Sequence, residues 1–244
     1  VVSVFFAISA LIATLILYLY TRDARSTALL VGAALLGVLW LLGMLKLCGY
    51  VLNPYSVLVP FLVFAIGLSH GAQKMNGIMQ DVGRGTHRYV AARYTFRRLF
   101  VAGLTALLTN AFAFAVMLVI DIPAIRDLAI TTSIGVVILI FTKLILIPVA
   151  LSYIGVGEKA ARRSLERGSA SGEKGLLGTV WEKIGHCSEP RYAIPLVVAA
   201  IGLGIASFAI SHAYLQIGDL DAGAPELRPG SRYNQDVAYI NAHY

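Results

Sequence analysis

Six long apolar runs dominate this sequence of 244 residues. A helix needs about 20 consecutive apolar residues to cross a bilayer, whereas the strands of a membrane barrel alternate over about ten residues. The runs are continuously apolar, so only helices fit them. The sequence therefore predicts an all-α, polytopic membrane protein with six spanning helices, at approximately residues 2–20, 28–45, 55–71, 99–120, 128–153 and 192–211.

The composition agrees with this class. Hydrophobic residues make up 58% of the chain and charged residues 14%, against roughly 45–50% apolar and about 25% charged residues in soluble domains. No basic segment with a small-residue cleavage site precedes the first run, so we interpret that run as a span and not as a signal peptide. The chain begins at Val1 and ends at Tyr244 in a polar tail, so we expect both ends to continue in a longer polypeptide.

Lysine and arginine are distributed unevenly between the two sides. Fifteen of the 20 basic residues fall in the connections after the first, third and fifth runs, and Lys74 is assigned to the second of these connections. Such an excess marks cytoplasmic loops, so both ends of the chain are expected on the opposite side. This topology explains the net charge of +7, and we predict no nucleic-acid partner.

Two of these connections are long. Residues 86–98 predict a basic surface helix next to anionic lipid headgroups. Residues 154–190 predict a cytoplasmic linker, solvated over 155–174 and followed by a short amphipathic helix. The apolar positions of that helix are Leu176, Leu177, Val180, Trp181 and Ile184.

Polar residues interrupt the apolar runs at a few places. Ser69, His70 and Gln73 lie in and directly after the third run, Asn110 in the fourth and Lys143 in the fifth. A charged residue at a helix centre costs roughly 2.5–3.5 kcal/mol on insertion, so such groups usually face a protein interior and mark an ion or substrate path. Counted from the outer ends of their runs, His70 and Lys143 both lie about 24 Å deep, and Asn110 lies nearer the middle. Lys143 has an equally weighted alternative, in which its long side chain extends to the cytoplasmic headgroups.

The residues also resemble a known family. The segments GLSHGAQ at the end of the third run and IDIPAIRDLAITTSIGVV between the fourth and fifth, together with Pro148 and the tail GDLDAGAPELRPGSRYNQDVAYI, are similar to the resistance-nodulation-division (RND) superfamily. The nearest branch is the MMPL type of hydrophobe and lipid exporters, with a bundle like a sterol-sensing domain. The resemblance implies a fold of twelve spans in two halves, of which this chain would hold spans two to seven.

The resemblance assigns domains along the chain. It implies that residues 1–153 form family spans two to six and that residues 191–212 form span seven. Residues 213–244 would begin the second periplasmic porter domain. It also implies a location in the bacterial inner membrane and export driven by protons, with possible homo-oligomers or a periplasmic partner protein.

The sequence departs from the family pattern at one functional position. Ser69 stands where relatives commonly place a proton-binding aspartate, and His70 occupies the neighbouring position. Histidine has an unperturbed pKa of about 6.5 and can bind and release a proton, whereas serine cannot. One hypothesis makes His70 the proton-binding element, and the other makes it a neutral, hydrogen-bonded interior residue with coupling in the second half. The candidate relay residues are His70, Ser69, Gln73, Asn110 and Lys143.

Three functional classes remain open at this stage. The first is an active exporter of a hydrophobic or lipid-like substrate, the second a non-transporting receptor that senses sterol-like lipid, and the third an accessory subunit of an envelope complex. An enzyme is not expected, because Ser69 and His70 are neighbours on one helix and point about 100° apart, with no orienting acid beside them. We also predict no cofactor and no metal, since the five histidines lack ligand spacing.

Overall fold

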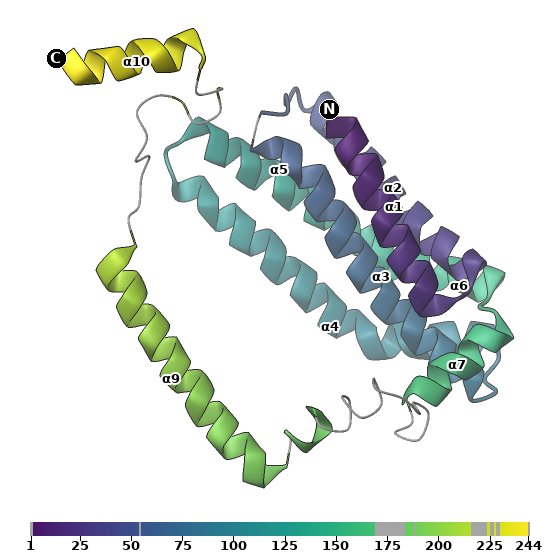
Figure 1. Ribbon diagram of the computed structural model, residues 1–244. Helices are drawn as coiled ribbons and strands as arrows, with labels where there is room; N and C mark the ends of the chain where they lie inside the picture. Colours follow the sequence, from purple (N-terminus) through teal and green to yellow (C-terminus); the bar gives the residue numbers. More distant parts are fainter. Residues whose placement is uncertain are drawn as a thin grey trace. The chain divides into compact units, whose positions relative to one another are not determined.

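A computed structural model describes residues 2–53, 55–168, 184–187, 189–215, 224, 227 and 230–243. The chain divides into two compact units, Val1–Gly172 and Glu173–Tyr244. Figure 1 shows the first unit as a bundle of long helices. Each unit is described by itself below.

The first unit is built from helices that follow the apolar runs. Within the described ranges, six helices of the whole chain are long and apolar enough to cross a membrane, and five of them belong to this unit. This confirms the predicted all-α membrane fold. The five spans are α1 (Val2–Thr21), α2 (Ala24–Leu47), α3 (Val59–Gly83) with its short leader η1 (Ser56–Leu58), α4 (Arg88–Val116) with η2 (Met117–Val119), and a composite fifth span. The fifth span comprises α5 (Pro123–Leu139), the π-helix η3 (Ile140–Leu146) and α6 (Ile147–Ile154).

Helix α3 lies at the centre of the bundle and contacts α2, α4, α5, α6 and the short helix α7 (Glu158–Gly168). Pro60 is in its first turn, where a missing backbone N–H breaks no intrahelical hydrogen bond. Gly67 and Gly71 are on its buried face and allow neighbouring side chains to approach the backbone. A polar residue on the buried face of α3 is therefore surrounded by protein and not by lipid.

The connection between α3 and α4 corrects one expectation from the sequence. Residues 74–98 do not form a loop with a separate surface helix, because α3 continues to Gly83 and α4 begins at Arg88. Lys74 accordingly lies within α3 and is buried. Only residues 84–87 form the turn, where Gly85 has a φ of +91° that suits glycine. The helices continue past the apolar runs because Met75, Ile78 and Met79 of α3 pack with Ala91 and Ala92 of α4 in one core cluster.

One end of this bundle is rich in arginine, and we call it the basic end. It comprises the α1–α2 turn (residues 22–23), the α3–α4 turn (residues 84–87) and α7 (Glu158–Gly168). The Asp23 carboxylate caps α2 by accepting from the Ser26 N–H and also accepts from the Gly157 N–H, each at 3.3 Å. Asp81, near the end of α3, pairs with Arg84 at 3.2 Å and with Arg98 of α4 at 3.4 Å.

Helix α7 closes the basic end against α3. Ala160 and Ala161 are buried, and the Ser164 hydroxyl is 2.7 Å from the Asn76 side-chain oxygen. A Cβ atom on Gly83 would lie 2.6 Å from the Ala161 carbonyl oxygen, so the two backbones meet closely. Residues 158–168 are thus a packed helix and not the solvated linker expected there. Of the amphipathic helix expected from Leu176 to Ile184, every residue except Ile184 lies outside the described residues.

Two long helices of the second unit have described bounds. Helix α9 (Pro190–Tyr214) has 25 residues and corresponds to the sixth predicted span. Pro190 is in its first turn and Pro195 is inside it. Helix α10 (Arg232–His243) follows in the polar tail.

Candidate functional site

Three basic side chains gather in the interior of the bundle, and we call them the interior cation cluster: His70 and Lys74 on α3, and Lys143 on η3. Lys143 is 0% exposed and Lys74 is 2% exposed. His70 and Lys74 are four residues apart, so they share one side of α3. A Cβ atom on Gly103 of α4 would lie close to both Lys74 Nζ and the side chain of Leu144, the residue that follows Lys143. The bundle therefore brings together basic groups from two spans.

Glycines on the facing helices make room for the two lysines. A Cβ atom on Gly67 of α3 would lie 2.8 Å from Lys143 Cε and 3.5 Å from its Nζ. On α4, a Cβ atom on Gly103 would lie 3.2 Å from Lys74 Nζ. A larger residue at either position would have to displace a lysine side chain. The two ammonium groups are thus held against helix backbones in a closely packed region.

Two nitrogen atoms of the cluster lack hydrogen-bond partners within the structure. Lys143 Nζ and His70 Nδ1 are both buried and unpaired. Neither Lys74 nor Lys143 forms an ion pair with any acidic residue in the described part of the chain. Buried polar groups in native proteins nearly always have a partner, and buried charges are normally paired. An unpaired set of this kind inside a membrane bundle is a functional candidate.

The backbone around Lys143 is itself unusual. Residues Ile140–Leu146 form a π-helix between α5 and α6, with Thr142, Lys143 and Leu144 all buried. The Thr142 hydroxyl donates to the Ile138 carbonyl oxygen at 3.2 Å. A π-helix contains more residues per turn than an α-helix and is frequently found at functional sites. Three consecutive residues can therefore face the bundle interior at this point.

The structure separates the predicted site residues into two groups. Lys143 packs on Gly67, one turn before His70, which agrees with the shared depth expected from the sequence. Ser69 and Gln73 instead lie on the exposed side of α3, and the Ser69 hydroxyl donates to the Ile66 carbonyl oxygen at 3.1 Å. Asn110 on α4 is half-buried, and no hydrogen bond among the described residues joins it to the cluster. His70 Nδ1 and Lys143 Nζ are therefore buried in the bundle, whereas Ser69 and Gln73 are exposed and Asn110 is half-buried.

Lys143 does not extend to the headgroup region, because its Nζ is buried inside the bundle. Lys74 was missed as a site residue because it follows the third apolar run and was counted with the cytoplasmic loop. Its spacing from Gly67 and Gly71 could have revealed it. Positions 67, 71 and 74 recur at helical intervals and mark one face of a longer helix.

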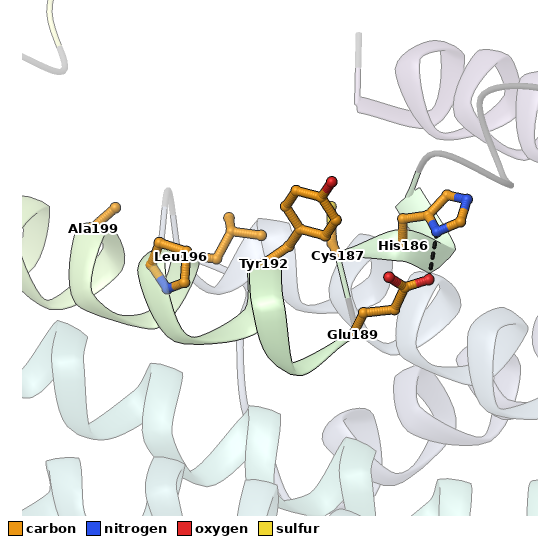
Figure 2. Close-up of a pocket in the computed structure, with 7 residues that line it drawn as sticks. His186, Cys187, Glu189, Tyr192, Leu196 and Ala199 are labelled. Atoms are coloured by element: carbon orange, nitrogen blue, oxygen red, sulfur yellow. Dashed lines mark hydrogen bonds and ion pairs between the residues drawn. The ribbon is translucent and has the colours of Figure 1, made fainter.

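A separate pocket lies in the second unit at the start of α9. It is lined by His186, Cys187, Glu189, Tyr192, Pro195, Leu196 and Ala199, and Figure 2 shows the His186 ring directed toward the Glu189 carboxylate. None of the candidate relay residues lines it. We therefore do not assign the site to this pocket.

Comparison with known proteins identifies the family. The sequence model of the MMPL family matches residues 2–194, which include all five spans of the first unit and the beginning of α9. No curated protein and no solved structure matches the chain. With this match and six membrane-spanning helices, the chain belongs to the MMPL family of RND-type membrane transporters.

Proposed function

We propose that this transporter exports a hydrophobic or lipid-like substrate and is driven by the proton gradient, with the interior cation cluster as its proton-exchanging element. The observation that carries this proposal is the burial of Lys143 and His70 with unpaired nitrogen atoms between packed spans. Ionisable residues inside a membrane bundle commonly belong to ion paths or proton relays. A proton is also small enough to reach such a closely packed site.

Histidine is the best candidate for the titrating member. The aspartate that relatives place at position 69 is absent, and Ser69 lies on the exposed side of α3. His70 is adjacent in sequence, faces the cluster and has an unperturbed pKa near 6.5. Lys74, one helical turn further along α3, then acts on the charge state of His70. Ser69, Gln73 and Asn110 are assigned to helix packing in this scheme.

The remaining sequence-based assignments belong to the same proposal. We place the protein in the bacterial inner membrane, with the basic end in the cytoplasm and both ends of the given sequence in the periplasm. Fourteen of the 20 basic residues support that orientation through the positive-inside bias, because the buried Lys74 no longer counts with the loop. Residues 213–244 then begin a second periplasmic porter domain. A homo-oligomer or a periplasmic partner protein is compatible with this arrangement.

Reconstitution of the full-length protein tests the proposal. Proteoliposomes with an imposed pH gradient would contain a phospholipid with a fluorescent acyl chain as the transport probe and a pH-sensitive dye in the lumen. We expect gradient-dependent probe movement coupled to proton flux, and a loss of at least about tenfold in both for His70→Ala, a typical effect of removing a proton-transfer group. Ser69→Ala is the matched control and should retain both rates.

Two results would contradict the proposal in different ways. Unchanged coupled flux in His70→Ala would remove the cluster histidine from the mechanism while leaving a transporter. A parent protein without gradient-dependent flux would instead favour the lipid-sensing receptor or the accessory subunit. Thermal melting of each variant in detergent would exclude misfolding as the cause of a lost rate.

A further inference from the structure

One exposed face of α4 runs from the basic end into the membrane-spanning part without interruption. Tyr89, Arg93 and Arg97 are exposed at the basic end, and Val101, Leu108 and Phe112 continue the exposed face along the helix. Val101 is 69% exposed and Phe112 is 68% exposed. Positions 93, 97, 101, 108 and 112 recur at helical spacing, so they form one stripe. The stripe has a cationic head and an apolar body.

The two arginines of this stripe differ from the other arginines around them. Arg84 and Arg98 pair with the Asp81 carboxylate, and Arg88 packs against Gly155, where a Cβ atom would lie 3.1 Å from Arg88 Cδ. Arg93 and Arg97 have no ion-pair partner within the part of the chain that the structure describes. They are one helical turn apart on the same face, so both guanidinium groups can reach one anion. Guanidinium groups bind phosphate through paired N–H donors.

The dimensions of the stripe match one leaflet of a bilayer. The span Arg88–Val119 has 32 residues, which at 1.5 Å per residue is about 48 Å long, against a hydrocarbon core of about 30 Å. The excess places the first turns of α4 in the headgroup layer, where the exposed Tyr89 and Tyr94 resemble an interfacial aromatic belt. From Val101 to Phe112 the helix rises by about 16 Å, which is close to the thickness of one leaflet's acyl region.

We propose that this stripe binds one anionic phospholipid of the leaflet at the basic end. Its phosphate group lies between the Arg93 and Arg97 guanidinium groups, and its acyl chains run along Val101, Leu108 and Phe112. The charge complementarity and the leaflet-long apolar face favour a lipid over a free phosphate, which would use only the head of the stripe. The site is independent of the interior cation cluster, because its residues lie on the opposite, exposed side of α4 from Gly103.

Lipid retention by the full-length protein tests the site. The protein would be placed in nanodiscs of phosphatidylcholine with a minor fraction of phosphatidylglycerol, and the lipids that stay bound would be measured by native mass spectrometry. Each guanidinium group that bonds the phosphate directly contributes at least about a fivefold gain in affinity, so we expect Arg93→Gln with Arg97→Gln to weaken phosphatidylglycerol retention by at least about 30-fold. The control pair, Arg25→Gln with Arg162→Gln, removes the same charge from other exposed positions at the same end. It should change retention less than about twofold.

Equal losses in both pairs would show only general attraction to the surface and would overturn the site, as would unchanged retention in the Arg93 and Arg97 pair. A second measurement identifies the occupant of the apolar stripe. A photoreactive amino acid in place of Val101 is expected to form an adduct with phosphatidylglycerol in the same nanodiscs. An adduct with a polypeptide would assign the stripe to a protein interface and overturn the lipid site.

Discussion

The interior cation cluster and the basic end both contain buried charged groups, but they satisfy those groups differently. At the basic end, Asp81 and Asp23 accept hydrogen bonds from two or more partners on separate elements. In the interior, Lys143 Nζ and His70 Nδ1 have none within the structure. Buried polar groups with hydrogen-bond partners on neighbouring helices stabilise the packing of those helices. Buried polar groups without partners lower the stability of the protein and are retained for another reason. The comparison separates a structural region from the proposed functional one, and mutations in the two regions should change the free energy of unfolding in opposite directions.

The largest effect is expected for Lys143→Met. An unpaired buried ammonium costs several kcal/mol in desolvation, and methionine is of similar length and apolar. We expect the free energy of unfolding in detergent to rise by about 2 kcal/mol, while proton-coupled transport falls. Lys46→Met, at an exposed position near the end of α2, is the control and should stay within about 0.5 kcal/mol. A destabilised Lys143→Met protein would mean that the Lys143 ammonium group has a stabilising partner in the folded protein. The proposed difference between the interior cation cluster and the basic end would then be wrong.

The opposite sign is expected for Asp81→Asn at the basic end. The substitution removes the negative charge that accepts hydrogen bonds from Arg84, Arg98 and the Thr95 hydroxyl. We expect it to lower the free energy of unfolding by about 1–2 kcal/mol. The Arg84 and Arg98 side chains are 56% and 51% exposed, so solvent screening keeps the loss below that of a fully buried ion pair. Thermal melting in low and high salt measures it. A more stable Asp81→Asn protein would show that the ion pairs and hydrogen bonds of Asp81 do not stabilise the basic end.

A smaller loss is expected for Asp23→Ala. The Asp23 carboxylate caps α2 and also accepts from the Gly157 N–H in the segment before α7. Loss of a helix cap typically costs about 1 kcal/mol. Hydrogen exchange should report faster opening at the start of α2 and of α7 together. If only α2 opens faster, the link between the two elements contributes nothing.

The smallest effect is expected for Ser69→Ala. The Ser69 hydroxyl bonds only to the Ile66 carbonyl oxygen of its own helix and lies on the exposed side of α3. The unfolding free energy should change by less than about 0.5 kcal/mol, because the carbonyl oxygen keeps its helical partner. A large loss of transport with unchanged stability would place Ser69 in the proton path and contradict the interior cation cluster as the proton-exchanging site.

The sequence predicted the spans well and the site only in part. Long apolar runs identify spanning helices directly, because few other folds satisfy the backbone in lipid. The helix ends were harder to predict, since α3 continues past its apolar run through Lys74 and α4 begins with the arginine-rich residues 88–98. His70 and Lys143 could be matched by depth, because the rise per residue is constant. Which side of a helix faces protein depends on its neighbours, so the sequence could not show that Ser69 and Gln73 are exposed while His70 Nδ1 is buried. The packing of α7 on Gly83 depends on a long-range backbone contact that local patterns do not encode.

The π-helix η3 also affects how the fifth span can be compared with related sequences. Before it, buried positions include Val136 and Leu139, and a continuous α-helix would bring residues 143, 146 and 150 to the same face. Lys143 is buried, but beyond it the fully buried residues are Leu144, Ile147 and Leu151 in place of positions 146 and 150, so after the π-helix the buried face comes one residue later. The wider turn absorbs one additional residue. A relative that is one residue shorter between positions 140 and 146 would keep both halves of this span packed, whereas the same deletion inside α5 would rotate its buried face toward lipid.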